Sequence, residues 1–105
     1  MIRALLAALL LAVTLPGAAR AAPPDHGPWT ALLEAHVRPI DGGASTVVDY
    51  DGFARDRLAL NRYLDSLSAV TRADFDRWNN AEQLAFLINA YNGYTIALVL
   101  SGWPD

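Results

Sequence analysis

Two asparagines inside an uncharged segment are the residues of this chain best placed to take part in chemistry. Asn89 and Asn92 are three positions apart, so on a helix they are separated by about 60° and both amides can point at one partner. A buried amide without a partner costs about 1–3 kcal/mol, so both side chains need one. Either the two amides orient a reacting group or line a pocket, or they hydrogen-bond the backbone of a neighbouring loop. We favour the structural role and keep both residues as candidate catalytic residues.

The histidines do not predict a metal site. His26 lies in a stretch rich in proline and glycine, and Glu34 and His36 are two positions apart, so on a helix they do not face each other. We therefore expect no bound metal, and we expect both histidines to be solvated or at the boundary of the core.

Two acidic patterns also fail as sites. The run 49–51 begins like a calcium loop, but Phe53 stands where an oxygen ligand is needed. Asp74 and Asp76 are two positions apart on an expected helix, so they point away from each other and cannot act as a catalytic pair. We expect these two aspartates to lie on the solvent-exposed face of that helix.

The sequence has no cysteine nucleophile and none of the common serine-nucleophile or phosphate-binding motifs. The chain has no cysteine, which excludes thiolate catalysis, thiolate zinc sites and iron–sulfur clusters within it. It also has no serine elbow, phosphate-binding glycine loop or dinucleotide fingerprint. No cofactor is expected, and no complete catalytic constellation is present.

The segment before the candidate asparagines predicts three short helices and one short strand. The first helix begins at Pro28, carries Trp29, Leu32, Leu33 and Val37 at helical spacing, and is ended by Pro39. A turn over 42–46 leads to a strand over 47–50, and Asp51 is the expected N-cap of the next helix. That helix has an apolar face, made by Leu60, Tyr63, Leu64 and Leu67. Thr71 with Asp74 resembles the cap of a third short helix.

The last expected helix carries both asparagines. Asn79 with Glu82, or Asn80 with Gln83, forms a capping box, and Gly102 ends a helix of roughly 20 residues. From 83 to 104 there is no charge, so this helix is either buried in a domain or spans a membrane. We expect it to be buried, with Tyr91 and Tyr94 in the core.

The N-terminal segment 1–21 predicts a secretory signal peptide. Arg3 gives the positive start, 5–15 form an uncharged apolar run, and 19–21 fit a cleavage site after Ala21. The run is about half the length that a membrane anchor needs. The chain is therefore expected to be exported to the periplasm or secreted, with 22–27 as a spacer.

Composition limits the expected partners and the size of the core. The 105 residues are 53% apolar with a net charge of −3. Without the signal peptide, six arginines face eleven acidic residues, a net charge of −5, so nucleic acid is not expected as a partner. The segment 22–105 that is left after cleavage supplies only a marginal core.

One segment resembles a known family. The stretch 83–96, with the core Asn89-Ala90-Tyr91-Asn92, is similar to the signature helix of the domain of unknown function 547 family. The order of 29–33, 48–50 and 60–64 agrees with the beginning of that family's domain. The resemblance implies an α+β domain that continues for roughly another hundred residues and includes a histidine and a cysteine. Residues 28–105 would be its mainly α, N-terminal helical part.

The sequence leaves three interpretations of the function. The first is the truncated half of a larger exported domain, inactive alone, whose last helix needs the absent C-terminal residues or another chain to cover it. The second is a membrane-associated helical module that places 83–104 in lipid. The two asparagines and the absence of flanking basic residues argue against that interpretation. The third is a small secreted binding module.

Overall fold

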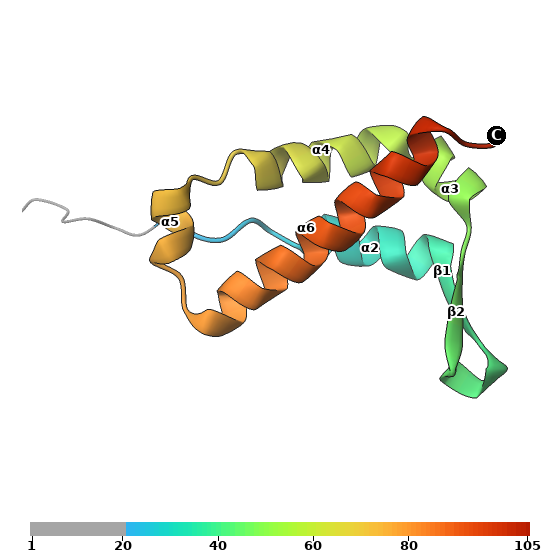
Figure 1. Ribbon diagram of the computed structural model, residues 1–105, viewed down its shortest axis with the longest axis horizontal. Helices are drawn as coiled ribbons and strands as arrows, with labels where there is room; N and C mark the ends of the chain where they lie inside the picture. Colours follow the sequence, from blue (N-terminus) through green and yellow to red (C-terminus); the bar gives the residue numbers. More distant parts are fainter. Residues whose placement is uncertain (1–20) are drawn as a thin grey trace, which may run out of the picture.

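A computed structural model describes residues 21–105, which form a mainly helical fold with one small sheet (Figure 1). The predicted mainly α class is confirmed. The elements in order are α2 (Gly27–His36), β1 (Val37–Ile40), η1 (Asp41–Gly43), β2 (Ser45–Val48), α3 (Tyr50–Arg55), α4 (Arg57–Ser68), α5 (Arg72–Asp76) and α6 (Asn80–Ser101). The predicted signal peptide lies outside the described residues, apart from its last residue, Ala21.

The first described helix, α2, carries a proline in its first turn, as predicted, but it ends earlier than Pro39. Its C-cap, Val37, is already extended, with φ −125° and ψ 128°. The physical reason is the restriction that a proline places on the residue before it, which keeps Arg38 out of the helical region. Pro39 therefore lies inside strand β1.

The strands β1 and β2 form an antiparallel hairpin, where the sequence predicted a single strand over 47–50. The register pairs Val37 with Val48 and Pro39 with Thr46. Proline is tolerated because in a two-stranded sheet each strand has an unpaired edge. The connection needs three consecutive positive φ angles, at Asp41 (53°), Gly42 (65°) and Gly43 (95°), and the two glycines adopt them without strain.

The predicted second helix is split in two, and its expected N-cap is wrong. Asp49, not Asp51, caps α3, because the Asp49 carboxylate accepts a hydrogen bond from the Gly52 backbone N–H at 2.9 Å. The chain leaves helical geometry at Asp56 and continues as α4. The predicted apolar face of α4 is confirmed, since Leu60, Tyr63, Leu64 and Leu67 are all buried.

Both C-terminal helices begin with the predicted caps. The Thr71 hydroxyl accepts from the Asp74 backbone N–H at 3.0 Å. Asn79 and Glu82 form the capping box of α6: each side chain accepts a backbone N–H of the other, at 2.8 and 3.1 Å. The alternative pair, Asn80 with Gln83, does not cap the helix.

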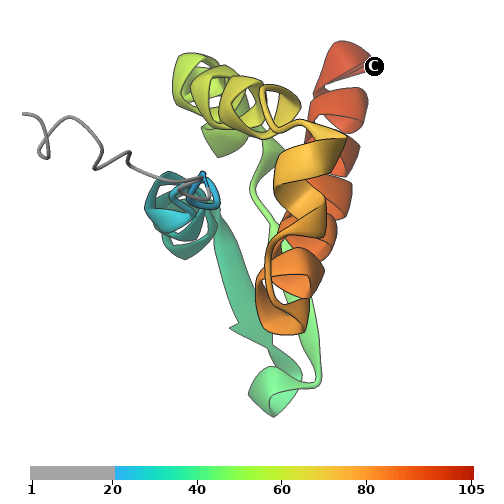
Figure 2. The ribbon, with the colours of Figure 1, turned by 90° about the vertical axis from the view of Figure 1, so that its left-hand side faces the viewer.

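The core lies where α2, α3, α4 and α6 meet (Figures 1 and 2). Trp29 of α2 stacks on Tyr63 of α4, with ring centroids 5.7 Å apart and planes 8° apart. The buried cluster consists of Trp29, Leu32, Phe53, Leu60, Tyr63, Leu64, Leu67, Ile96 and Leu100. Long helix α6 supplies only two of these large apolar side chains.

The helix α6 is covered on one side only, which corrects the expectation of a buried helix. Its buried residues are Gly93, Ile96 and Leu100, all on the side that meets α3 and α4. Tyr91, expected in the core, is 74% exposed. Tyr94 is 43% exposed and lies at the edge of the covered side, because its hydroxyl donates to the Leu64 carbonyl of α4 at 3.1 Å. In Figure 2, α6 stands at one edge of the molecule, with no other element beyond it. The other helices are too few to surround it.

Candidate functional site

The two candidate asparagines lie on adjoining parts of α6 but meet different neighbours. Asn89 is partly buried and hydrogen-bonds the Tyr63 side chain of α4. Asn92 is exposed and lines a surface hollow of about 250 Å³ together with Trp29, Val48 and Ile96. The structure therefore does not bring the two amides to one partner, as their spacing had suggested: Asn89 meets α4, and Asn92 lies near α2 and the hairpin.

A chain of polar contacts runs through the Tyr63 hydroxyl. His26 Nδ1 lies 2.7 Å from that oxygen, and the Asn89 amide is its second partner. Burial raises the pKa of Tyr63 to about 12, and the hydrogen bond with Asn89 acts in the opposite direction. With so high a pKa the phenol stays protonated near neutral pH, so it can donate or accept a hydrogen bond but cannot act as a base.

This chain of contacts connects three segments. His26 directly precedes α2, and its ring packs edge-on against that of Tyr63 at 5.9 Å. The expectation of a solvated or boundary histidine therefore misses a specific contact, because the two residues are 37 positions apart and no local spacing connects them. The arrangement joins the start of α2 to α4 and α6.

The second histidine is buried, which corrects its expected place. His36 is 9% exposed, and its Nε2 lies 2.6 Å from a carboxylate oxygen of Asp56. Its other ring nitrogen lies over Gly52, where an added Cβ would be only 2.3 Å away. The pair thus fastens the end of α2 to the junction of α3 and α4.

Three acidic side chains, one beside His26 and two from the acidic patterns, have structural partners. Asp25 accepts from the Gly27 backbone at 2.8 Å, and Asp51 accepts from the Trp103 indole at 2.7 Å. Asp76 accepts from Arg72 at 3.0 Å. Within residues 21–105, no three histidine, aspartate or glutamate side chains gather in a way that could hold a metal ion.

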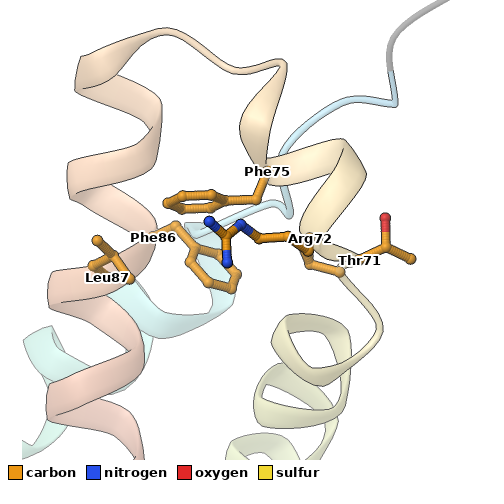
Figure 3. Close-up of a pocket in the computed structure, with 6 residues that line it drawn as sticks. Thr71, Arg72, Phe75, Phe86 and Leu87 are labelled. Atoms are coloured by element: carbon orange, nitrogen blue, oxygen red, sulfur yellow. The ribbon is translucent and has the colours of Figure 1, made fainter.

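An apolar hollow of about 290 Å³ lies between α5 and α6 (Figure 3). Phe75 and Phe86 form its walls with ring centroids 5.7 Å apart, and Leu87 lies at its rim. Figure 3 shows the Arg72 side chain reaching toward both rings, although its Nε is already bound to Asp76. The hollow is lined mainly by carbon.

Most of the exposed large apolar side chains in the described part of the chain lie along one side of α6, which we call the outer face of α6. At about 100° per residue, its members fall within an arc of about 120°. It consists of Leu84 (58% exposed), Leu87 (54%), Ile88 (50%), Tyr91 (74%), Tyr94 (43%) and Leu98 (73%). An apolar stripe of this length on a surface marks a contact with protein or membrane.

Comparison with known protein families, curated proteins and solved structures found no match to this chain. The resemblance to the domain of unknown function 547 family therefore stays a prediction. Among the described residues, one helix, α6, is long and apolar enough to cross a membrane. The outer face and the asparagine side of that helix are the features on which a function can be argued.

Proposed function

We propose that the chain is the exported N-terminal helical part of a larger domain, inactive alone, in which α6 is covered by further polypeptide. The observation that supports the proposal most directly is the outer face of α6. Six large apolar side chains stay in contact with water on a helix whose only charge is Glu82. A folded soluble protein gains roughly 25 cal/mol for each square ångström of such surface that it buries, so the face is suited to packing.

The asparagines fit the same proposal. Asn89 lies on the core side of α6, against Tyr63, whereas Asn92 lies between the core side and the outer face and borders an open hollow. Polypeptide that covers the helix would reach the exposed Asn92 amide, so the two residues can contribute to a site that other residues complete. The resemblance to the domain of unknown function 547 family suggests that the covering part contains a histidine and a cysteine.

The test uses the monomeric chain and the dye 1-anilinonaphthalene-8-sulfonate, which fluoresces on exposed apolar surface. We expect the dye to bind, and we expect a separately expressed C-terminal half of a full-length family member to form a one-to-one complex that displaces it. A monomer that does not increase the fluorescence of the dye and that unfolds cooperatively on heating would contradict the proposal. It would favour the small binding module instead.

Membrane association is the second candidate, and it has one specific observation in its favour. The helix α6 has 22 residues and a mean hydropathy of 1.4 in its most apolar window, of which only 17% is buried. However, α6 packs against α4, whose exposed side carries Arg57, Arg62 and Asp65. Insertion of α6 would bring those charges to the lipid or strip α6 from the core, and both outcomes are costly.

Cell fractionation distinguishes the two candidates. Material that enters the supernatant after an alkaline wash of the membranes supports the half-domain proposal. Material that remains in the membrane pellet supports insertion of α6 into lipid and contradicts the half-domain.

A further inference from the structure

The exposed residues of α6 repeat with the spacing of a helix-packing seam. Leu84, Leu87, Tyr91, Tyr94, Leu98 and Ser101 are separated by intervals of three, four, three, four and three residues. This is the a and d pattern of a heptad repeat, which packs against a second helix at a crossing angle of about 20°. Five of these six side chains are large and apolar, and each is at least 43% exposed. The Tyr94 hydroxyl is bonded to the Leu64 carbonyl of α4 at 3.1 Å, so Tyr94 contributes only the exposed part of its ring to the seam. The spacing thus indicates that the occupant of this face is a helix.

We propose that, in this chain, a second copy of α6 fills that place, in an antiparallel symmetric dimer. The inference rests on the proposed function only in taking the outer face of α6 as a packing surface. In the antiparallel register, a positions meet d positions: Leu87 packs on Leu98 of the second copy, and Tyr91 packs on Tyr94 of the second copy. Leu84 meets Ser101 of the second copy at the ends of the seam. The face is thus complementary to itself, as a two-fold interface requires.

The charge distribution favours this occupant and this direction. The outer face carries no charge, so two copies can approach without repulsion or the burial of an unpaired ion. The only charge of α6, Glu82, lies in its first turn. An antiparallel arrangement keeps the two Glu82 residues apart and aligns the helix dipoles favourably, whereas a parallel one would bring both acidic ends together.

The size of the seam is sufficient for association. A helix of 22 residues is about 33 Å long, so the repeat covers nearly five turns. Covering the outer face on both copies would remove on the order of 1,200 Å² of surface from water, which is the lower limit of stable interfaces. The edge position of α6 in Figure 2 leaves this side free for the approach of a second copy.

The absence of cysteine from the sequence allows a direct test of the register. The full chain, with its own N-terminal segment, is made with Leu87→Cys or with Leu98→Cys, and a short bis-maleimide is added. We expect a mixture of the two variants to crosslink at least ten times more efficiently than either variant alone. Efficient crosslinking of Leu87→Cys to itself would indicate a parallel seam and overturn the inference.

A second measurement tests whether the seam holds the dimer. By light scattering we expect the mass of two chains at micromolar concentration, and we expect Leu98→Glu to raise the dissociation constant at least tenfold. The matched control is Leu58→Glu, because Leu58 is 64% exposed on α4, outside the seam, and its replacement should leave the mass unchanged. A dimer that withstands Leu98→Glu would overturn the inference.

Failure of the dimer is distinguishable from failure of the proposed function. A monomer at all concentrations that binds the apolar dye overturns the dimer and keeps the half-domain. A monomer that leaves the dye dark overturns both, as does a chain held in membranes after the alkaline wash.

Discussion

The contact between His36 and Gly52 requires glycine, a residue without a Cβ, inside the short helix α3. A Cβ on Gly52 would lie 2.3 Å from the His36 ring and 2.7 Å from the Asp49 carboxylate, and both groups are fixed by other hydrogen bonds. We expect Gly52→Ala to lower the free energy of unfolding by about 2 kcal/mol, although alanine is the better helix former. Urea denaturation measures this change.

The matched control is Gly93→Ala in α6. There an added Cβ would meet the end of the Leu64 side chain at 2.9 Å and the Tyr63 ring at 3.9 Å, so the one close contact is with the flexible end of a side chain. Its effect should stay within about 1 kcal/mol of zero, because the gain in helix propensity offsets the crowding. Equal effects of the two substitutions would show that the His36 ring does not restrict position 52.

The pKa of Tyr63 predicts a loss of stability in alkali. The folded chain keeps the phenol protonated up to a pKa of about 12, whereas the unfolded chain loses the proton near the ordinary value of 10.0. The contribution is therefore fully present below pH 10 and is lost as the pH rises through 12. Because water partly screens the hydroxyl, the free energy of unfolding should fall between those values by on the order of 1–2 kcal/mol more than in Tyr63→Phe. Parallel pH profiles would contradict this assignment.

The two asparagines should differ in their effect on stability. Asn89→Ala removes a hydrogen bond to the Tyr63 hydroxyl and should cost about 1 kcal/mol. Asn92 is exposed, so Asn92→Ala should change the free energy of unfolding by less than about 0.5 kcal/mol. Thermal denaturation of both variants gives the comparison, and an equal loss at both positions would mean that Asn92 also belongs to the scaffold.

At this scale, residue type and local spacing predicted little beyond the caps. The partners His26 with Tyr63 and His36 with Asp56 are 37 and 20 positions apart, so only the folded chain brings them together. The separation of Asn89 and Asn92 around the helix could be predicted because helix geometry alone sets it. Their different neighbours depend on how α2 and α4 pack, which spacing does not contain.

Among the elements, the start of α6 depends on one side chain. Asn79 accepts the Glu82 backbone N–H at 2.8 Å, and Glu82 accepts the Asn79 backbone N–H in return. We expect Asn79→Ala to cost about 1 kcal/mol, measured by urea denaturation. Its neighbour supplies the control: Asn80→Ala should be neutral, because Asn80 is the first helical residue and is exposed. A larger loss of stability for Asn80→Ala than for Asn79→Ala would show that Asn80 with Gln83 caps the helix instead.

The elements that the sequence predicted best are those set by local signals. Caps at Thr71 and Asn79 and the apolar face of α4 depend on residues within one or two turns of each other. The hairpin was missed in part, because β1 has only four residues and includes Pro39, which offers no strand signal. Its formation depends on the glycine turn and on pairing with β2.

For the whole molecule, α6 has two sides with different roles. The inner side carries Ile96 and Leu100 into the core, and the outer face stays in water. The absence of charge over 83–104 predicted that the helix must be shielded from water. The small number of other predicted helices indicated that this chain alone could not shield it on all sides. Which side would be covered could not be predicted, because both sides are apolar and periodicity does not separate them.

Two leucines near the end of α6 test that division. Leu100 is 4% exposed, and Leu100→Ala should lower the free energy of unfolding by about 2–4 kcal/mol, because it leaves a cavity beside α3 and α4. Leu98 is 73% exposed two positions earlier, and Leu98→Ala should stay within about 0.5 kcal/mol when measured on the monomer. The two substitutions remove the same atoms from the same helix, so helix propensity and residue volume cancel in the comparison. A large loss at Leu98 in the monomer would mean that the chain covers the outer face itself, and the need for another polypeptide would disappear.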